Sequence, residues 1–353
     1  MAAFMQAVVI ARPGGPEVLE VREVPVPEPG PGEVRVRVHA VGLNRADILQ
    51  RKGHYPAPPG VPADIPGLEY AGEVAALGSS ASSAAGRGWV VGDRVMGLVA
   101  GGACAEFLVA HGDTLLAVPD DWPGSTGTSG VSPAIDREAD QLVTAAAIPE
   151  VFVTAYDALV RQMHLVAGES VLIHAVSSGV GTAAVQLAHA WGARTFGTSR
   201  SAAKLARAVP LGLDVAIDTS REDFADVVKR ETGGRGVDVV LDLVGGPALA
   251  GNIEALAPRG RMIVVGLTAG RTAPLDLGLV LTKRLTIVGT ALRNRSPGEK
   301  AALTRDFARE VMPLFASGRV APVLDRVFAM VEVAEAHRRM ETNAHFGKIV
   351  LAW

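Results

Sequence analysis

A glycine-rich turn near the middle of the 353-residue sequence has the pattern of a phosphate-binding loop. The run Gly179-Val180-Gly181-Thr182-Ala183-Ala184 matches G-x-G-x-x-A and follows the apolar segment Val171-Leu172-Ile173. Glycines in a strand-to-helix turn let the backbone approach a pyrophosphate, which the amide groups that open the helix can bind. Such turns also occur for close packing alone, but this one begins a series of strand-helix-strand units, which favours dinucleotide binding. The predicted phosphate contacts are Ser177, Ser178, Gly179, Val180 and Gly181.

The residues after the next predicted strand indicate which nicotinamide cofactor would bind. An NAD site usually has a carboxylate there, which accepts hydrogen bonds from the ribose 2′-hydroxyl. This sequence has Thr198-Ser199-Arg200-Ser201 instead, with Lys204 one turn later. Arg200 and Lys204 can pair with a 2′-phosphate, although both can also be solvated cations at the start of a helix. We predict NADP(H), with Ser199, Arg200 and Lys204 as contacts.

Alternating strands and helices would position these residues. From about Ala145 to Thr290, apolar segments, turns and amphipathic segments repeat, which is typical of βαβ units in a doubly wound parallel sheet. In the first third of the chain, Val34, Val36 and Val38 alternate with polar residues, as in an antiparallel sheet with one buried face. The predicted later elements are strands over Ser170–Ala175, Arg194–Thr198, Val215–Ile217, Val237–Leu243, Arg261–Gly266 and Leu285–Val288, a helix over Glu299–Ser317, and a strand over Lys348–Ala352 that returns to the first domain.

Composition restricts the class of protein. Hydrophobic residues make up 48% of the chain, and 34 basic against 37 acidic residues give a net charge of -3, so no general positive field attracts nucleic acid or anionic lipid. A single cysteine excludes an intrachain disulfide and no signal-peptide pattern opens the chain, so we expect a cytoplasmic protein. No apolar run approaches the roughly 20 residues of a membrane span. The length favours two domains, and Ser79–Gly88 and Gly124–Ile135 are expected to be extended surface loops.

Five short motifs are spread over nearly the whole chain. They are Gly14-Gly15-Pro16-Glu17-Val18-Leu19, Gly42-Leu43-Asn44-Arg45-Ala46-Asp47-Ile48, Pro66-Gly67-Leu68-Glu69-Tyr70-Ala71-Gly72, Ala147-Ile148-Pro149-Glu150 and Gly347-Lys348-Ile349-Val350-Leu351. Together they resemble the quinone oxidoreductase branch of the medium-chain dehydrogenase/reductase superfamily. Within that branch, Gln50-Arg51, Gly53-His54-Tyr55 and Pro58-Pro59-Gly60 are similar to the p53-inducible quinone oxidoreductase group.

The resemblance implies an α/β protein with a GroES-like, β-rich catalytic domain over residues 1–144 and 296–353 and a doubly wound Rossmann domain over residues 145–295. It also implies NADPH-dependent reduction of quinones, or of similar electron-poor enones, in a cleft. The further cofactor contacts that it implies are Tyr55, Thr154, Thr219, Val265, Gly266, Leu267, Ala291, Leu292, Arg293 and Lys348. The sequence departs from the family at Val176 and Ser178, where smaller residues or glycine are usual, and at Thr219, where some relatives bind the 2′-phosphate with a tyrosine.

We predict that the protein binds no metal. Structural zinc needs four thiolate or imidazole ligands, and the chain has one cysteine. Where zinc-bearing relatives have their catalytic Cys and His, this sequence has Asn44 and Leu68, and its eight histidines show no ligand spacing. Glu69 remains beside the lost ligand, with either a catalytic role or a hydrogen-bonding role inside the domain. His174 and Cys104 fit buried core positions better than chemical roles.

Without a metal, catalysis depends on holding the nicotinamide C4 against an electron-poor acceptor with water excluded. The predicted catalytic residues are Asn44, Asp47 and Tyr55. Asn44 would hydrogen-bond the substrate carbonyl or the cofactor carboxamide, or would only cap a turn. Tyr55 would donate a proton or hydrogen bond, or would only pack in its loop. Asp47 would orient Asn44 or cap the helix that begins there.

The last predicted strand of the parallel sheet bears on assembly, and the choice of reaction stays open. The segment Leu285–Gly289 ends the sheet, and its apolar edge favours a homodimer joined edge to edge. An NADPH:quinone reductase is the leading function. A 2-alkenal or enoyl reductase would use the same chemistry with a placed proton donor and an acyl channel. A crystallin-like or RNA-binding role is disfavoured by the acidic balance and by the lack of a basic stripe with interleaved aromatics.

Overall fold

The computed structural model describes residues 3–81, 88–119 and 137–353. The predicted loop over 124–135 and most of the predicted loop over 79–88 lie outside the described residues. The chain divides into two compact units, which we call unit 1 (Met1–Val153 and Leu292–Trp353) and unit 2 (Thr154–Ala291). The chain passes from unit 1 to unit 2 at 153/154, nine residues after the predicted boundary at 144/145. It returns to unit 1 at 291/292, four residues before the predicted boundary at 295/296.

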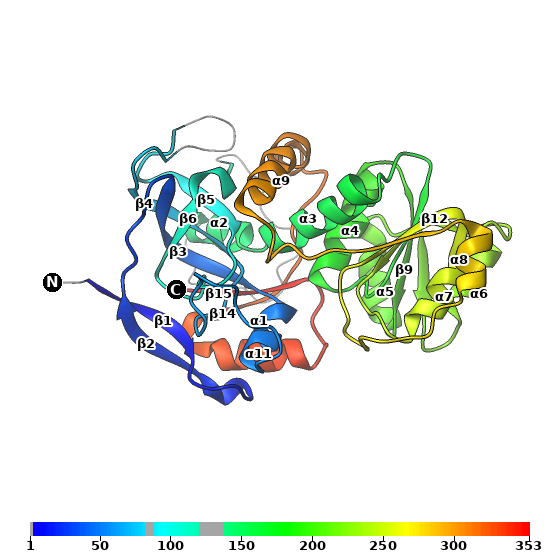
Figure 1. Ribbon diagram of the computed structural model, residues 1–353, viewed down its shortest axis with the longest axis horizontal. Coiled ribbons are helices and arrows are strands. Elements are labelled where there is room, and N and C mark those ends of the chain that lie inside the picture. The colour runs from blue at the N-terminus through cyan, green and yellow to red at the C-terminus, as the bar shows by residue number, and fades with distance from the viewer. Residues whose placement is uncertain (1–2, 82–87, 120–136) are drawn as a thin grey trace. The chain divides into compact units, whose positions relative to one another are not determined.

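Unit 2 contains one six-stranded parallel sheet with helices packed around it (Figure 1). The strand order is β10-β9-β8-β11-β12-β13, so the first strand lies at the centre and the order reverses beside it, as in dinucleotide-binding sheets. The strands are β8 (Ser170–Ile173), β9 (Arg194–Ser199), β10 (Val215–Asp218), β11 (Val237–Asp242), β12 (Leu256–Val264) and β13 (Thr286–Gly289). The helices are α4 (Gly179–Ala190), α5 (Ala202–Ala208), α6 (Phe224–Glu231), α7 (Ala248–Ala255) and α8 (Leu277–Lys283).

All six strands predicted for this sheet are present, and one of them begins earlier than predicted. β12 starts at Leu256, five residues before Arg261. Leu256 pairs with Val237 of β11, and the next pair is Arg261 with Val239, so β12 has extra residues between the two pairs. The skipped residues include Arg259, which has a φ of +64°. Their sequence, Ala-Pro-Arg-Gly, resembles a turn, and the sheet accommodates it as a bulge.

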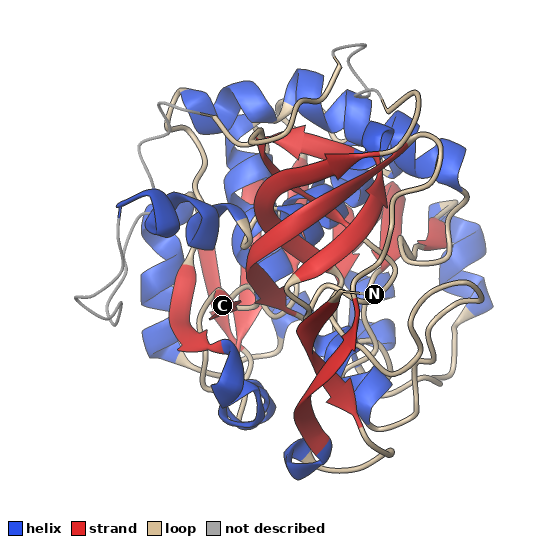
Figure 2. Ribbon diagram, turned by 90° about the vertical axis from the view of Figure 1, so that its left-hand side faces the viewer, coloured by secondary structure: helices blue, strands red, loops and turns tan. Residues whose placement is uncertain are grey.

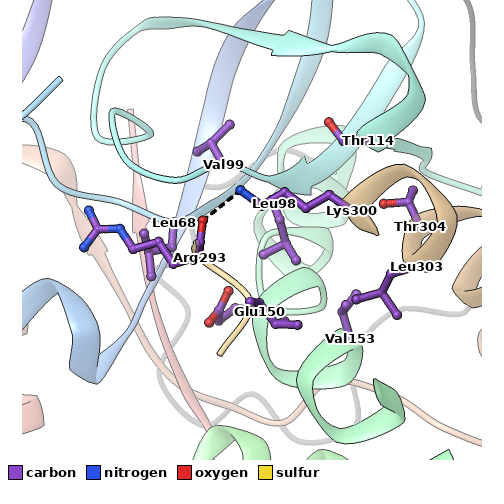
Figure 3. A pocket seen from close by; sticks show the side chains of 11 residues that line it. Leu68, Leu98, Val99, Thr114, Glu150, Val153, Arg293, Lys300, Leu303 and Thr304 are labelled. Atoms are coloured by element: carbon purple, nitrogen blue, oxygen red, sulfur yellow. Dashed lines mark hydrogen bonds between the residues drawn. The ribbon is translucent and has the colours of Figure 1, made fainter. Parts of the chain in front are cut away.

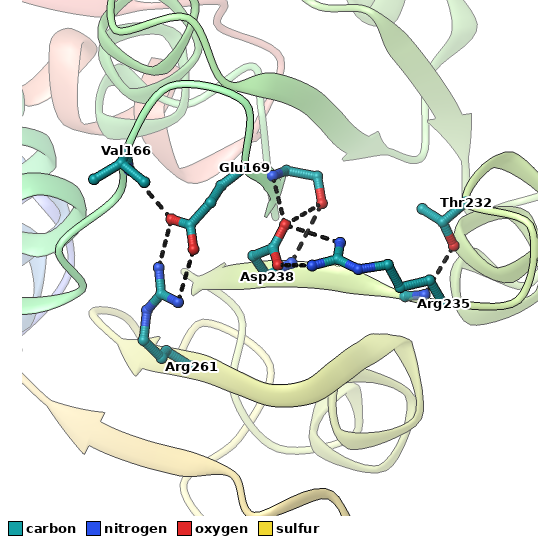
Figure 4. A network of polar contacts seen from close by, with 8 residues as sticks. Val166, Glu169, Thr232, Arg235, Asp238 and Arg261 are labelled. Carbon is teal, nitrogen blue, oxygen red and sulfur yellow. Dashed lines mark hydrogen bonds and ion pairs between the residues drawn. The ribbon is translucent and has the colours of Figure 1, made fainter.

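Polar contacts tie together the amino ends of three of these strands (Figure 4). Arg261 on β12 forms a bidentate pair with Glu169, with nitrogen–oxygen distances of 3.0 and 2.7 Å. Asp238 on β11 accepts hydrogen bonds from the backbone N–H and the hydroxyl of Ser170 at 2.9 and 3.0 Å, and it also pairs with Arg235. These contacts therefore lie at the opposite end of the strands from the glycine turn, which follows the carboxyl end of β8.

Unit 1 is built on a seven-stranded, mainly antiparallel sheet and a separate two-stranded ribbon. The path of the sheet is β14-β15-β3-β4-β5-β7, with β6 also paired to β3. Figure 2 shows these strands strongly twisted, with the β1–β2 ribbon beside them. The strands are β1 (Phe4–Ile10), β2 (Leu19–Pro25), β3 (Glu33–Leu43), β4 (Glu69–Leu77), β5 (Arg94–Leu98), β6 (Phe107–His111), β7 (Leu115–Ala117), β14 (Leu324–Ala329) and β15 (Lys348–Ala352).

The helices of unit 1 are α1 (Arg45–Arg51), α2 (Arg137–Ala145), most of α3 (Pro149–Tyr156), α9 (Pro297–Glu310), α10 (Met312–Ala316) and α11 (Val333–Glu341). The prediction of one helix over Glu299–Ser317 is wrong, because the chain breaks at Val311 into α9 and α10. Pro313 explains the break, since proline has no amide hydrogen for the interior of a helix but is accepted in a first turn.

Two sequence patterns in unit 1 are confirmed. Val34, Val36 and Val38 on β3 are buried, and they belong to the main apolar core of the unit. β15 returns from the C-terminus to pair antiparallel with β3, with Ile349 opposite Leu43. This pairing brings Lys348, the first residue of β15, next to the end of β3, where α1 begins.

A helical stretch over Gln141–Gln162 is long and apolar enough to cross a bilayer by length and composition alone. The prediction that no apolar run approaches the length of a membrane span is therefore wrong. Within this stretch, 89% of the most apolar window is buried in the protein, as expected for a core helix. The stretch also contains Glu150, which lines the pocket described next.

Candidate functional site

The glycine turn of unit 2 joins β8 to α4. The helix begins at Gly179, and Ser178 is its N-cap, with the Ser178 hydroxyl oxygen accepting a hydrogen bond from Gly181 N–H at 3.0 Å. A Cβ atom added at Gly181 would lie 2.4 Å from the carbonyl oxygen of Ala175, so only glycine fits. Ala175 itself has a φ of +47°, which turns the chain sharply out of the strand. The turn therefore presents the N-terminus of a 12-residue helix at the carboxyl end of the first strand of the sheet, where pyrophosphates bind in such folds.

The departure from the family pattern at Val176 has a structural explanation. Val176 is fully buried, and its side chain lies against β9 at Gly197, where an added Cβ would be 2.9 Å from a Val176 methyl group. Val176 thus packs into the sheet, and Gly197 on the next strand makes room for it.

A buried hydrogen-bond network lies behind the turn. The two ring nitrogens of His174 contact the Thr198 hydroxyl at 2.9 Å and the Asn252 side-chain oxygen at 2.6 Å. Asn252 donates to Asp242, whose other oxygen accepts hydrogen bonds from the N–H groups of Val244 and the next residue. Burial lowers the pKa of His174, so the ring is neutral at neutral pH. The prediction that His174 is a satisfied core residue is confirmed.

The residues predicted to select the cofactor come together at the carboxyl ends of β9 and β10. Thr219 N–H donates to the Ser199 carbonyl oxygen at 3.0 Å, and the Ser199 hydroxyl accepts a hydrogen bond from Ser201 N–H at 3.2 Å. Arg200 is exposed, and Lys204 lies in the first turn of α5, where Ser201 is the N-cap. β9 ends without a carboxylate, since its last residues are Thr198 and Ser199.

The other predicted cofactor residues divide between the two units. Thr154 is buried on α3, and Val265, Gly266 and Leu267 follow the end of β12. Val265 and Gly266 donate their N–H groups to the carbonyl oxygen of Asp242, which fixes this turn beside β11. Ala291 is the last residue of unit 2. The remaining predicted contacts, Tyr55, Leu292, Arg293 and Lys348, belong to unit 1.

Four buried polar side chains meet in unit 1 where β3, β4 and β15 approach the start of α1. Lys348 donates hydrogen bonds to the Leu43 carbonyl oxygen and to Asn44 Oδ1, both at 2.8 Å, and it also pairs with Glu69. Asn44 Nδ2 donates to Gly42 O at 3.0 Å and to Glu69 Oε1 at 2.8 Å. We call Asn44, Asp47, Glu69 and Lys348 the buried cluster.

Asp47 fixes the backbone around the buried cluster. Its carboxylate accepts hydrogen bonds from Asn44 N–H at 2.7 Å and from Gly67 N–H at 3.0 Å. The first contact caps α1 and also orients Asn44, so both roles considered for Asp47 coincide. Burial raises the pKa of Asp47 to about 6, although the two N–H donors and Lys348 oppose the shift.

The structure places Lys348 and Arg293 differently from the prediction that they contact the cofactor. The Lys348 ammonium group is buried, and its three partners within the buried cluster account for its three protons. Arg293 is also buried, with hydrogen bonds to Ala100 O at 2.6 Å, Tyr55 O at 3.1 Å and Gln50 Oε1 at 2.6 Å. Its guanidinium group lies 4.9 Å from the centre of the Tyr55 ring. Arg293 therefore holds the Tyr55 loop.

A further buried contact anchors α1. Arg51 at the end of this helix is fully buried and donates to Gly14 O at 3.1 Å and to Glu341 at 2.7 Å, and it contacts His337 at 3.1 Å. Burial and the adjacent guanidinium group lower the pKa of His337 to about 3, so this ring stays neutral. α1 is thus fixed at its start by Asp47 and at its end by Arg51.

A pocket opens beside the buried cluster, within unit 1 (Figure 3). Its lining surrounds about 450 Å³, a figure that includes solvent at its open side. Leucine and valine side chains form most of the wall, and the polar side chains are Thr114, Glu150, Arg293, Lys300 and Thr304. Lys300 Nζ donates to Arg293 O at 2.8 Å, as the dashed line in Figure 3 shows.

Sequence reasoning did not identify Glu150 or Lys300 as site residues. Glu150 appeared only as part of a family motif, and Lys300 only as part of a helix. A detectable signal was present for Glu150, because it is an acidic residue inside a helical stretch that, among the described residues, is long and apolar enough to cross a membrane. For Lys300, the pocket depends on residues far apart in the sequence, and the chain itself gave no signal.

The polar residues around the pocket do not fit a zinc ion. Zinc favours cysteine and histidine ligands, and the buried cluster offers an amide and two carboxylates whose oxygens already accept protein hydrogen bonds. Cys104 is buried, and burial raises the pKa of its thiol, which disfavours the thiolate that zinc needs. Among the residues that the structure describes, no group of three or more His, Cys, Asp or Glu side chains is arranged to hold a metal.

Comparison with known proteins gives a consistent picture. The alcohol dehydrogenase GroES-like domain matches residues 30–135, and the zinc-binding dehydrogenase family matches residues 179–312. A quinone oxidoreductase of Pseudomonas aeruginosa is 34% identical over 340 residues, which is 96% of both chains.

Solved structures of the same fold cover 99% of the chain. A quinone oxidoreductase of Pseudomonas syringae superposes with a TM-score of 0.82 at 31% identity over 100% of its own chain. The CurK enoyl reductase gives 0.81 at 28% identity over 99% of its chain. A mycobacterial protein whose structure is described as complexed with NADPH gives 0.81 at 27% identity over 100% of its chain.

Proposed function

Because the chain belongs to the medium-chain dehydrogenase/reductase superfamily, with quinone oxidoreductases among its relatives, we propose that it reduces quinones or similar electron-poor enones with NADPH. The α/β fold, with a GroES-like part and a Rossmann-like parallel sheet, is as predicted. The protein is an oxidoreductase that acts on a small molecule and uses a nicotinamide cofactor. We propose three further points: that the cofactor is NADPH, that the mechanism uses no metal, and that the protein belongs with the p53-inducible quinone oxidoreductase group.

The turn between β8 and α4 carries this proposal. Gly181 lets the start of α4 pack closely against the turn, since any Cβ there would collide with Ala175 O, and Ser178 caps the helix N-terminus, whose N–H groups suit a pyrophosphate. The residues present fit a dinucleotide. The preference for NADPH over NADH is supported by the absence of a carboxylate at the end of β9 and by Arg200 and Lys204 directly after it.

A bound nicotinamide would supply the hydride. The residues of the chain have four tasks in this mechanism. The turn residues Ser177–Gly181 hold the phosphates, and Arg200 and Lys204 neutralise the 2′-phosphate. Asn44, whose amide group is hydrogen-bonded within the buried cluster, positions that cluster, and Tyr55 with apolar side chains lines the substrate side and excludes water. In the buried cluster, Asn44 stands where zinc-bearing relatives have their catalytic cysteine, and its Oδ1 accepts a hydrogen bond from Lys348. This supports direct hydride transfer without a metal.

We assign the catalytic role to unit 1 and the cofactor-binding role to unit 2. Unit 1 contains the pocket and the buried carboxyl groups beside it, which supports the catalytic role. Unit 2 contains the turn proposed to bind phosphate, which supports the cofactor-binding role. Localisation in the cytoplasm remains part of this proposal, because the single cysteine is buried and unpaired.

Parallel titrations with NADPH and NADH test the cofactor assignment. We expect NADPH to bind at least tenfold more tightly, as measured by calorimetry, with turnover on a simple benzoquinone in protein free of zinc by elemental analysis. Equal affinity for the two nucleotides would contradict the roles of Arg200 and Lys204. Activity that needs stoichiometric zinc would contradict the metal-free mechanism.

A 2-alkenal or enoyl reductase is the second candidate, supported by the structural similarity to the CurK enoyl reductase. Turnover of a benzoquinone, an alkenal and an enoyl thioester under the same conditions separates the two candidates. A crystallin-like or RNA-binding role would be indicated by RNA retention on a filter without any NADPH oxidation.

We also propose a homodimer joined through β13. This strand ends the parallel sheet, and Ile287 on it is 36% exposed, while Leu277 and Leu281 on α8 are 70% and 77% exposed. Exposed apolar side chains beside an open strand edge favour pairing with a second copy. Sedimentation at micromolar concentration should give twice the chain mass, and a monomer would contradict the proposal.

A further inference from the structure

The inference concerns Glu150 and rests on the proposed function. Glu150 lies in the first turn of α3, and its side chain lines the pocket together with Leu68, Val153 and Arg293 (Figure 3). Its backbone N–H donates to Glu69 Oε2 at 2.8 Å, which links the pocket to the buried cluster. Within the described part of the chain, no hydrogen bond to the Glu150 carboxyl oxygens is found. This carboxyl group therefore has its hydrogen-bonding capacity available to a ligand in the pocket.

The charges around Glu150 indicate which carboxyl group carries a proton. Asp47, Glu69 and Glu150 lie close enough to repel one another, and the buried cluster supplies one ammonium group, Lys348, to balance them. The oxygens of Asp47 and Glu69 accept hydrogen bonds from N–H donors, which suit the ionised form. Glu150 has no such donors. The proton of this group of carboxyls is thus best placed on Glu150.

The electrostatic surroundings of Glu150 agree with that assignment. Burial and the Glu69 carboxylate raise the pKa of Glu150 to about 8, Asp47 adds to the shift, and Lys348 and Arg293 oppose it. Lys300 and Tyr55 are the other titratable groups that face it. Burial lowers the pKa of the Lys300 ammonium group, which Glu150 opposes, and burial raises the pKa of the Tyr55 phenol, to which Glu150 adds.

We propose that Glu150 is the proton donor of the reaction: its neutral carboxyl group hydrogen-bonds a carbonyl oxygen of a quinone in this pocket and then protonates that oxygen. The quinone first accepts a hydride, that is, two electrons and one proton, and becomes a hydroquinone anion. The O–H bond of Glu150 then breaks and a new O–H bond forms on the anion, which gives the neutral hydroquinone and the Glu150 carboxylate. The carboxylate regains a proton from water through the open side of the pocket after the product leaves.

The pocket suits this class of substrate. Its wall is largely leucine and valine, which favour the flat, apolar ring of a quinone, and Glu150 supplies one polar contact for an oxygen on the ring edge. The Arg293 guanidinium group does not compete for that contact, because it is held by three acceptors in unit 1.

Single-turnover kinetics of Glu150→Gln test the proposal. Glutamine keeps the shape but cannot give up a proton, so the rate of quinone reduction should fall by about 10²–10⁴-fold, the usual contribution of a general acid. NADPH affinity, measured by calorimetry, should change by less than about twofold. Glu23→Gln, the same substitution at an exposed site of unit 1, should leave both quantities unchanged. Glu150→Asp, which keeps the acid, should keep a pH dependence that Glu150→Gln lacks.

The pH dependence of the rate of the unmodified enzyme is an independent test, and it does not depend on whether a variant folds. Since the acid form is the active one, its rate should be constant at neutral pH and fall about tenfold per pH unit above about 8. An unmodified enzyme that reduces quinones at a constant rate up to pH 10, or a Glu150→Gln variant with full activity, would refute the role of Glu150 and leave the proposed function intact. An unmodified enzyme that binds NADPH but reduces no quinone or enone would refute the proposed function and this inference with it.

Discussion

Unit 2 builds its candidate site from main-chain groups, whereas unit 1 builds its site from charged side chains that contact one another. In unit 2, the turn after β8 depends on a glycine that allows close backbone packing and on helix N–H groups, and its polar residues lie at strand ends. In unit 1, Glu69 and Lys348 are buried and hydrogen-bonded to Asn44 and to main-chain groups. The two sites should therefore fail in different ways when a single residue is changed.

This difference has an energetic basis. A main-chain site tolerates most side-chain changes but not the loss of space, because its donors belong to the backbone. A buried ionic cluster fixes geometry through desolvated charges, and removing one partner leaves the other without compensation. We expect changes in unit 1 to reduce stability first, and changes in unit 2 to reduce cofactor affinity first.

Lys348→Met should have the largest effect and would test the unit 1 side of the comparison. The Glu69 carboxylate would then be buried without its ammonium partner, so the free energy of unfolding in denaturant should fall by about 3–5 kcal/mol. Lys52→Met is the control, because the Lys52 ammonium group pairs with Glu341 at the surface and its loss should cost less than about 1 kcal/mol. Adding Glu69→Gln to Lys348→Met should recover part of the loss, and equal stability of the two variants would argue against a charge effect.

Gly181→Val tests the main-chain side of the comparison. The new side chain would collide with Ala175 O and push α4 away from the turn, so the dissociation constant for NADPH should rise at least ~100-fold, or about 2.7 kcal/mol. The measurement is calorimetric titration. Gly298→Ala is the control, since Gly298 is also in the first turn of a helix and an added Cβ meets nothing within 4 Å. Unchanged NADPH affinity in Gly181→Val would place the phosphates elsewhere.

The double variant Arg200→Ala with Lys204→Ala sharpens the comparison, because it changes side chains of unit 2 and leaves the turn intact. We expect NADPH affinity to fall about tenfold or more through the loss of charge-assisted contacts, and NADH affinity to stay the same. Arg230→Ala, a loss of positive charge at the end of α6, should affect neither. An equal loss for both nucleotides would mean that these cations do not contact a 2′-phosphate.

Asp238→Asn should have the smallest effect. It tests whether the stability of unit 2 also depends on a charged contact away from its candidate site. Burial raises the pKa of Asp238, but hydrogen bonds from Arg235 and Ser170 outweigh burial and lower it overall. A lowered folded-state pKa means that the contribution is present above the unfolded pKa of about 3.9 and is lost as pH falls below it. The variant should lose about 1 kcal/mol in denaturant at pH 7, and its difference from the unmodified protein should shrink as the pH is lowered from about 3.9 through the folded-state pKa. A difference that stays constant as the pH is lowered through this range would exclude an ionic contribution.

The sequence was most informative where local patterns determine structure. The six strands of unit 2 and the return of β15 to β3 follow from apolar periodicity, and the glycine turn follows from its spacing. Errors arose where two local signals competed, as at Pro313, which ends one helix and opens another. The bulge in β12 was missed because its Pro and Gly resemble a turn.

The candidate site of unit 1 was only partly predictable. Asn44, Asp47 and Tyr55 were proposed as site residues from motifs and stay predictions. The partners of Lys348 and Arg293 could not be predicted, because those contacts join residues roughly 240–300 positions apart in the chain. Nothing in the local sequence says whether a lysine at the start of a strand reaches a phosphate or turns into the interior. Only the packed sheet decides this, since β15 places Lys348 beside the end of β3.

The single cysteine has a practical consequence. Cys104 is 1% exposed and burial raises the pKa of its thiol, so maleimides and other thiolate-directed reagents should leave the native chain unlabelled. A cysteine introduced at a surface position in each unit would then be the only target for a pair of dyes or spin labels. The protein thus lacks a reactive native thiol that would interfere with testing whether the two units move when a nucleotide is added.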